Sequence, residues 1–104
     1  MSYTVGPLVI SRTPDGLHVA GEIDASTVEA FSSDLLSMLA TRDVAVNMSE
    51  IQFIDSSGLR VLIEAHSNAL EQRRQFVIDS PSPIVKRLLE VTGLSDLFTI
   101  VPVH

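Results

Sequence analysis

The sequence predicts an α/β fold, with a mixed β-sheet that begins with an antiparallel hairpin and helices packed against the sheet. Two observations carry this prediction. Near the start, two β-rich runs flank a tight-turn sequence, and farther along, apolar helical faces alternate with short apolar runs typical of strands. A hairpin followed by alternating helices and strands gives a sheet with parallel crossovers.

The first half of the chain contributes the hairpin, a helix and the chain up to Asp55. Leu8–Ile10 and Leu17–Ala20 are the β-rich runs, and residues 13–16 between them read Thr-Pro-Asp-Gly, an order that favours a tight turn. The first helix is expected to start with a capping box of Ser26 and Glu29 and to end near Ala40. Its apolar face is Val28, Phe31, Leu35, Met38 and Leu39. The β-rich residues 44–48 and 51–54 then lead to Asp55.

The second half repeats the alternation of helix and strand. A helix is expected from Gly58, a strand over residues 75–78, a third helix opened by Pro81 and Pro83, and a last strand near residues 99–101. Gly93 favours an end to the third helix in the left-handed conformation, with the next residue folded back on the last turn. The apolar faces are Leu59, Leu62, Ile63, Ala69 and Leu70 in the second helix, and Ile84, Val85, Leu88 and Leu89 in the third.

Composition narrows the class of protein. The 104 residues are 45% apolar and 19% charged, which predicts a single globular domain over residues 1–104 with one core. The chain has no Cys, so disulfides, thiolate metal sites and Cys nucleophiles are excluded. We see no secretory signal, and no apolar run approaches the roughly 18 residues of a membrane span. A soluble, cytoplasmic protein is expected.

Charge and motif content point to a protein partner. The net charge is −6 with seven Lys and Arg, which argues against direct nucleic-acid binding, because basic side chains hold phosphate backbones. The sequence contains no glycine-rich phosphate loop and no His and acidic residues at metal-ligand spacing, so neither a cofactor nor a metal is predicted.

Residues 55–59, Asp-Ser-Ser-Gly-Leu, stand where an apolar run ends and a helical pattern begins. Free N–H groups at a helix start attract an anion, whereas Asp55 would repel a phosphate on Ser56, which brings about two negative charges. Working surfaces of open α/β sheets gather at the carboxyl ends of strands, so Asp24 is expected near this turn. The turn is therefore predicted to act as a charge switch.

The same residues have structural interpretations. Asp55, Ser56 and Ser57 are good N-caps in any protein, and Gly58 suits close packing of a helix on a strand. Asp24 either marks the start of the first helix or contacts a partner. Local sequence alone favours capping over modification.

A resemblance changes that balance. Residues 21–24 (Gly-Glu-Ile-Asp), 53–59 (Phe-Ile-Asp-Ser-Ser-Gly-Leu) and 85–94 (Val-Lys-Arg-Leu-Leu, then Thr-Gly-Leu) together resemble the STAS domain of bacterial anti-sigma factor antagonists. The resemblance spans nearly the whole chain. It implies a domain that binds an anti-sigma factor with serine kinase activity and so frees a sigma factor for transcription.

The resemblance also implies roles for individual residues. In that family the serine directly after the Asp is phosphorylated, which here is Ser56. Phosphorylation breaks the complex, and a separate serine phosphatase restores binding. Ser57 is then expected to be the helix cap. Partner contacts are expected at Asp24, Asp55, Ser57, Gly58 and Arg60.

Two departures from the family pattern stand out. Arg60 occupies a position where the family often has a second glycine, and residues 71–74 read Glu-Gln-Arg-Arg where a glycine-rich loop is common. Arg60 either steadies a phosphate on Ser56 or binds an acidic partner, and it leaves the size of the switch open.

Two rival functions follow from the same sequence. An enzyme with Ser56 as nucleophile needs a histidine base, but the Gly-x-Ser-x-Gly elbow is absent and the three histidines are His18 in a strand, His66 on an apolar helix face and His104. A STAS scaffold of another signalling or transport assembly would bind its partner constitutively, without a phospho-switch.

Overall fold

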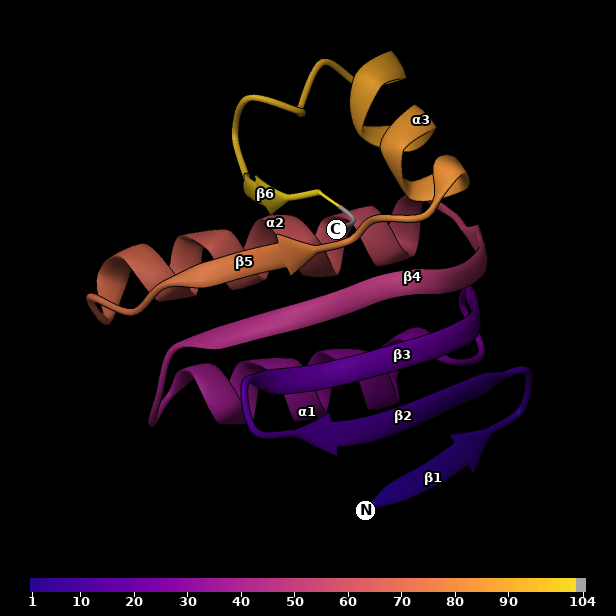
Figure 1. The fold of residues 1–104 in the computed structure, drawn as a ribbon, viewed down its shortest axis with the longest axis horizontal. Coiled ribbons are helices and arrows are strands. Elements are labelled where there is room, and N and C mark those ends of the chain that lie inside the picture. The colour runs from indigo at the N-terminus through magenta and orange to yellow at the C-terminus, as the bar shows by residue number, and fades with distance from the viewer. Residues whose placement is uncertain (103–104) are drawn as a thin grey trace.

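The computed structural model describes residues 1–102. Within them six strands form one sheet in the order β1-β2-β3-β4-β5-β6, and three helices follow β3, β4 and β5 (Figure 1). The strands are β1 Ser2–Val5, β2 Leu8–Thr13, β3 Gly16–Ile23, β4 Val44–Ile54, β5 Phe76–Asp79 and β6 Thr99–Val101. The helices are α1 Val28–Leu39, α2 Ser56–Glu71 and α3 Pro83–Val91.

The sheet is mixed, as the sequence predicts. β1, β2 and β3 pair antiparallel, whereas β3 through β6 pair parallel. The predicted hairpin is confirmed, because β2 and β3 pair from Leu8↔Gly21 to Thr13↔Gly16. β1 was not predicted from the sequence. An edge strand with exposed side chains carries no apolar alternation that would reveal it.

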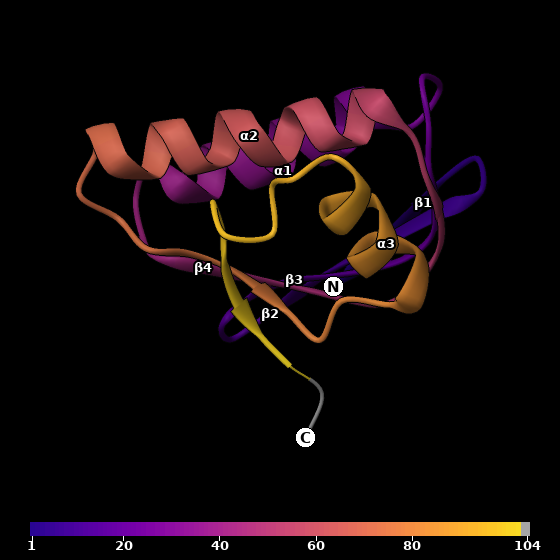
Figure 2. The ribbon, with the colours of Figure 1, turned by 90° about the horizontal axis from the view of Figure 1, so that it is seen from above.

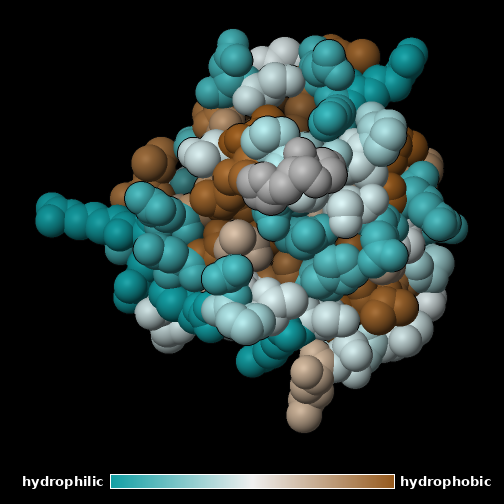
Figure 3. All heavy atoms as spheres, in the orientation of Figure 1, coloured by the Kyte–Doolittle hydropathy of each residue, from teal (hydrophilic) through white to brown (hydrophobic). Residues whose placement is uncertain are grey.

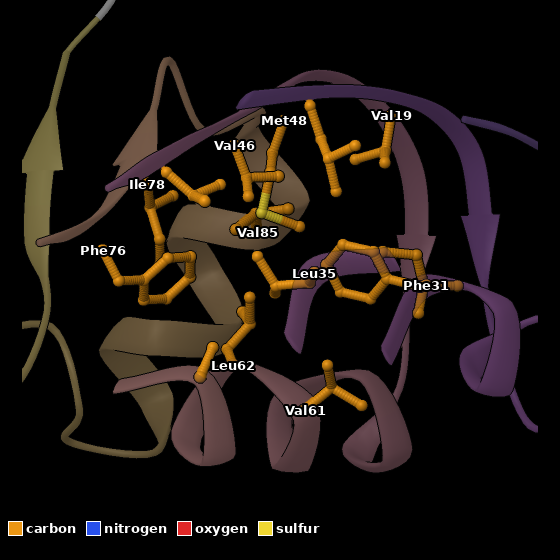
Figure 4. Close-up of a cluster of buried hydrophobic side chains, with 14 of the residues drawn as sticks. Val19, Phe31, Leu35, Val46, Met48, Val61, Leu62, Phe76, Ile78 and Val85 are labelled. Carbon is orange, nitrogen blue, oxygen red and sulfur yellow. The ribbon is translucent and has the colours of Figure 1, made fainter. Parts of the chain in front are cut away.

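The helices α1 and α2 lie over the same face of the sheet (Figure 2). Figure 4 shows the core between the layers, where Phe31 of α1 and Leu62 of α2 point toward Val46 and Met48 of β4. These four side chains are nearly or fully buried. α3 adds Val85 to the same cluster. Figure 3 views the helix-free face of the sheet, where hydrophilic side chains mix with smaller hydrophobic groups.

Most of the predicted apolar faces are confirmed. Phe31, Leu35, Met38 and Leu39 are buried in α1, while Val85 and Leu89 are buried in α3. Leu70 is the exception, since 67% of its surface is exposed. It lies at the border of the apolar stripe of α2, where the neighbouring Ala69 takes the inward position.

The end of α3 forms as predicted. Gly93 has φ +72, the Leu94 N–H donates to the Leu89 carbonyl at 2.9 Å, and the Gly93 N–H donates to the Glu90 carbonyl at 3.1 Å. This pair of bonds is a Schellman motif, which satisfies the last carbonyls of the helix. None of the helices within residues 1–102 has an apolar stretch long enough to cross a membrane.

The start of α1 differs from the prediction. Thr27 is its N-cap and makes no side-chain capping bond, so the capping box of Ser26 and Glu29 is wrong. The Ser26 side chain instead donates to Asp24. Thr27 is fully buried and its hydroxyl donates to the Glu22 carbonyl at 3.0 Å, which ties the helix start to the end of β3.

Candidate functional site

The candidate site lies where β3 and β4 end side by side. These strands are parallel neighbours, with Ile23 paired to Ile54, and the Asp55 N–H donates to the Ile23 carbonyl at 3.2 Å. Asp24 and Asp55 each follow the last residue of their strand. The structure therefore brings the two carboxylates together, close enough for the charge of Asp24 to act on Asp55.

The two strand ends carry the same local turn. Asp24 Oδ1 accepts the Ser26 N–H at 2.9 Å and the Ser26 hydroxyl at 2.6 Å. Asp55 Oδ1 accepts the Ser57 N–H at 2.9 Å and the Ser57 hydroxyl at 2.5 Å. Both are Asx turns of the pattern Asp-x-Ser. The middle residue is exposed in each, but it is Ala25 in one turn and a serine in the other.

Asp55, and not Ser57, caps α2. Its backbone is extended, at φ −109 and ψ −171, and its carboxylate accepts the N–H groups of Ser57 and Gly58. The expectation that Ser57 is the cap is wrong, because the Ser57 hydroxyl donates to the capping carboxylate. Two of the N–H groups at the helix start that were expected to be free for an anion are therefore already hydrogen-bonded to Asp55.

These hydrogen bonds stabilise the ionised carboxylates. The Ser57 hydroxyl lowers the pKa of Asp55 below its usual value, and the Gly58 and Ser57 amides add to the effect, while partial burial and Asp24 act against it. The Ser26 hydroxyl likewise lowers the pKa of Asp24. Both groups are therefore negatively charged at neutral pH.

Ser56 is the first residue of α2, and its side chain is exposed. Within residues 1–102 its hydroxyl makes no hydrogen bond, whereas the hydroxyl of Ser57 is held by Asp55. Of the two adjacent serines, Ser56 is therefore the one whose oxygen is free to react.

Gly58 lies where the first turn of α2 crosses the ends of β3 and β4. A Cβ at this position would stand 2.7 Å from Ile54 Cγ1 and 2.8 Å from Ile23 Cγ2, closer than side chains tolerate. The prediction that Gly58 serves close packing of helix on strand is confirmed. The absence of a side chain seats the Asp55 turn directly on the sheet.

Arg60 lines a hollow of about 380 Å³ between α1 and α2. Glu29 and Glu64 also line the hollow, and Arg60 is the only basic residue among those that line it. The full lining is Val28, Glu29, Ser32, Ser33, Ser57, Arg60, Val61 and Glu64. The α1 side of this surface was not predictable from the sequence, because the contact of α1 with α2 arises only in the folded chain.

The histidines are placed away from this site. His18 pairs with Glu50 at 2.9 Å, and His66 packs edge-on against Phe98 with ring centroids 5.8 Å apart. His66 is ten residues after Ser56 on α2, about 15 Å along the axis. His104 lies outside the described residues. Residues 1–102 thus place no histidine as a base beside Ser56.

Two substitutions of the N-cap Asp55 should separate the contribution of its capping hydrogen bonds from that of its negative charge. We expect Asp55→Ala to lower the free energy of unfolding by about 1 kcal/mol, since Ala offers no acceptor to the amides. Asp55→Asn should fall between Ala and wild type, because Asn caps well but lacks the charge. Urea unfolding at neutral pH measures all three.

The same variants test the lowered pKa of Asp55. Its ionised form stabilises the folded state above the ordinary value of 3.8, and this contribution is lost as pH falls through the lower pKa of the folded state. The stability gap between wild type and Asp55→Asn should therefore narrow below pH ~4. Asp24 titrates in both proteins, so its own hydrogen bonds cancel in the difference and only its repulsion of Asp55 remains. A gap that stays constant down to acid pH contradicts the assignment.

Comparison with known proteins identifies the family. The STAS domain family matches residues 9–104. The anti-sigma-B factor antagonist of Staphylococcus aureus (strain NCTC 8325 / PS 47) is 33% identical over 81 residues, covering 76% of this chain and 75% of the relative. The anti-sigma-B factor antagonist of Listeria monocytogenes is 31% identical over 86 residues, covering 81% of this chain and 75% of the relative.

Solved structures agree on the fold. An anti-sigma factor antagonist from Mycobacterium paratuberculosis superposes with a TM-score of 0.77 at 22% identity, over 92% of this chain and 85% of that one. The anti-sigma factor antagonist SpoIIAA in its unphosphorylated form superposes with a TM-score of 0.70 at 18% identity, over 88% and 85%. With this fold and these relatives, the chain belongs to the STAS domain family.

Proposed function

We propose that this chain is an anti-sigma factor antagonist, which binds an anti-sigma factor with serine kinase activity and releases a sigma factor until Ser56 is phosphorylated. The observation that carries the proposal is the free, exposed hydroxyl of Ser56 on the Asp55 turn. The names of the curated relatives support the same role. The proposed place of action is the cytoplasm.

The chemistry needs only an acceptor from this chain. The Ser56 Oγ attacks the γ-phosphorus of ATP held by the partner, the new Oγ–P bond forms, and the bond to the β,γ-bridging oxygen breaks to release ADP. The hydroxyl proton passes to a base of the kinase. A serine phosphatase reverses the step with water. We accordingly propose a regulator without a catalytic site of its own.

The partner surface is proposed to surround the acceptor. Asp24 and Asp55 place two carboxylates at the strand ends, and Gly58 allows the turn to lie flat on the sheet. Ser57 holds Asp55 in place, while Arg60 adds a cation one helical turn beyond Ser56. A phosphate on Ser56 would lie at the centre of this surface. The charge would therefore change most at the place where the partner must remove water on binding.

A constitutive STAS scaffold is the second candidate. Arg60 is the observation that favours it, because a cation beside Ser56 offsets part of the charge that a phosphate brings. In this alternative the same surface binds its partner whatever the state of Ser56.

Affinity capture with tagged wild type, Ser56→Ala and Ser56→Glu separates the two candidates. The switch predicts a GHKL-type ATPase that Ser56→Ala retains and Ser56→Glu loses. With Mg-ATP added to the captured complex, peptide mass spectrometry should locate phosphate on Ser56 in wild type and find none in Ser56→Ala, which retains the partner but lacks the acceptor. The same partners on all three baits would instead establish the constitutive scaffold.

A further inference from the structure

Arg60 has no ion-pair partner among the described residues, although acidic side chains lie near it. Within residues 1–102 the Arg12 guanidinium pairs with Asp34 and the His18 ring contacts Glu50, and Arg60 takes part in neither contact. Glu29 and Glu64 line the same hollow. Glu64 follows Arg60 by four residues on α2, and a cation placed before an anion at this spacing is the weaker order of a helical pair. The guanidinium of Arg60 is therefore available to a stronger anion.

The position that such an anion would take is Ser56. It precedes Arg60 by four residues on α2, so the two side chains lie on one face of the helix, with Cβ atoms about 6 Å apart. Helical side chains lean toward the amino terminus, which directs Arg60 over the turn that holds Ser56. An anion before a cation is also the favourable order for this spacing.

Few backbone N–H groups remain near Ser56 to compete with Arg60 for a phosphate on that residue. At an open helix start the amides of the first turn would receive the phosphate. Here the Asp55 carboxylate already accepts the Ser57 and Gly58 amides. Asp55 and Asp24 also repel a phosphate from the strand-end side of the turn, so the phosphate is driven along α2 toward the guanidinium.

We propose that Arg60 binds the phosphate of phosphorylated Ser56 as an ion pair within α2. This inference rests on the proposed modification of Ser56. On this geometry Arg60 offsets part of the roughly two negative charges that phosphorylation adds, and the hollow loses the only basic side chain that lines it. Arg60 is then available to a partner only while Ser56 is unphosphorylated.

Titration of the phosphate by ³¹P NMR tests the pair without any partner protein. Phosphoserine is incorporated genetically at position 56 in wild type, Arg60→Gln and Arg60→Lys. A nearby cation favours the dianion, so Arg60→Gln should raise the second phosphate pKa, which is ordinarily about 6, by roughly half a unit relative to wild type. Arg60→Lys should restore part of the shift, and salt at about 1 M should abolish the difference.

Arg73→Gln is the matched control. It removes the same charge just beyond the other end of α2, about 25 Å from Ser56, and its titration should match wild type. The inference is overturned if Arg60→Gln titrates like wild type, or if Arg73→Gln moves the pKa as far as Arg60→Gln does. Failure to find a kinase partner would count against the proposed function and leave this measurement unaffected.

Discussion

Phosphorylation of Ser56 is expected to weaken binding of the anti-sigma factor by a hundredfold or more. The phosphate stands next to Asp55, whose lowered pKa keeps it ionised. At ~6 Å a dianion and a carboxylate repel by about 1 kcal/mol in water and roughly 5 kcal/mol at an effective dielectric near 20. A partner that excludes water from the turn moves the pair toward the larger value, and ~1.4 kcal/mol is a factor of ten in affinity.

Two features of the turn govern how much of this penalty remains. Asp55 holds the amides of Ser57 and Gly58, so the helix start gives the phosphate little in return. Arg60 offsets part of the repulsion, but an ion pair between residues four apart on an exposed helix contributes only about 0.2–0.5 kcal/mol. The repulsion is therefore the larger effect, and the complex should change from formed to unformed.

Isothermal titration of the captured partner with unmodified and phosphoserine-56 protein measures the ratio of affinities. Asp55→Asn in both backgrounds is the informative control. It keeps a capping side chain but removes the charge, so the ratio should shrink if repulsion by Asp55 drives release. A ratio near one in the wild-type background would remove Ser56 as the switch and favour the constitutive scaffold.

Gly21→Ala is expected to cost roughly 3–5 kcal/mol of folding free energy, a large part of the 5–15 kcal/mol that holds a domain together. Gly21 has φ +107, where a side chain is strained by about 1–3 kcal/mol. A Cβ there would also stand 2.0 Å from the Pro7 carbonyl oxygen. That carbonyl accepts the Glu22 N–H at 3.0 Å, and the next residue, Leu8, is fully buried, so the backbone has little room to move.

Gly93→Ala provides the matched control for strain without a clash. Gly93 has φ +72, and a Cβ there would meet nothing within 4 Å. Its replacement should cost only about 1 kcal/mol. Urea unfolding of both variants measures the difference. Equal losses would show that the contact with Pro7 relaxes and that strain alone accounts for the effect of Gly21→Ala.

Local sequence signals were sufficient for elements whose residues interact with their own neighbours. Gly93 and Leu94 end α3 as predicted, because a Schellman motif is built from one segment of chain. The buried face of α1 follows from the spacing of Phe31, Leu35 and Met38. Such signals failed for β1, an exposed edge strand that pairs with β2 through its backbone and has no buried face of its own.

The site shows the same division. The position of Asp55 and Ser56 at a strand-to-helix turn was predictable, but local sequence offers three capping candidates in a row. The extended backbone of Asp55 selects it over Ser57, because only that geometry turns the carboxylate back to the Ser57 and Gly58 amides. The choice of cap in turn decides which serine hydroxyl is free.

The sequence by itself determined the mixed α/β class and the strand-end location of the Asp55 turn, since apolar periodicity and the order of elements are properties of the chain. The tertiary structure alone decided that Gly58 is pressed against Ile23 and Ile54 and that Arg60 faces a hollow shared with Glu29 of α1. Those contacts join segments distant in sequence. Their distances depend on how α1 and α2 pack over the sheet, and no local pattern encodes that packing.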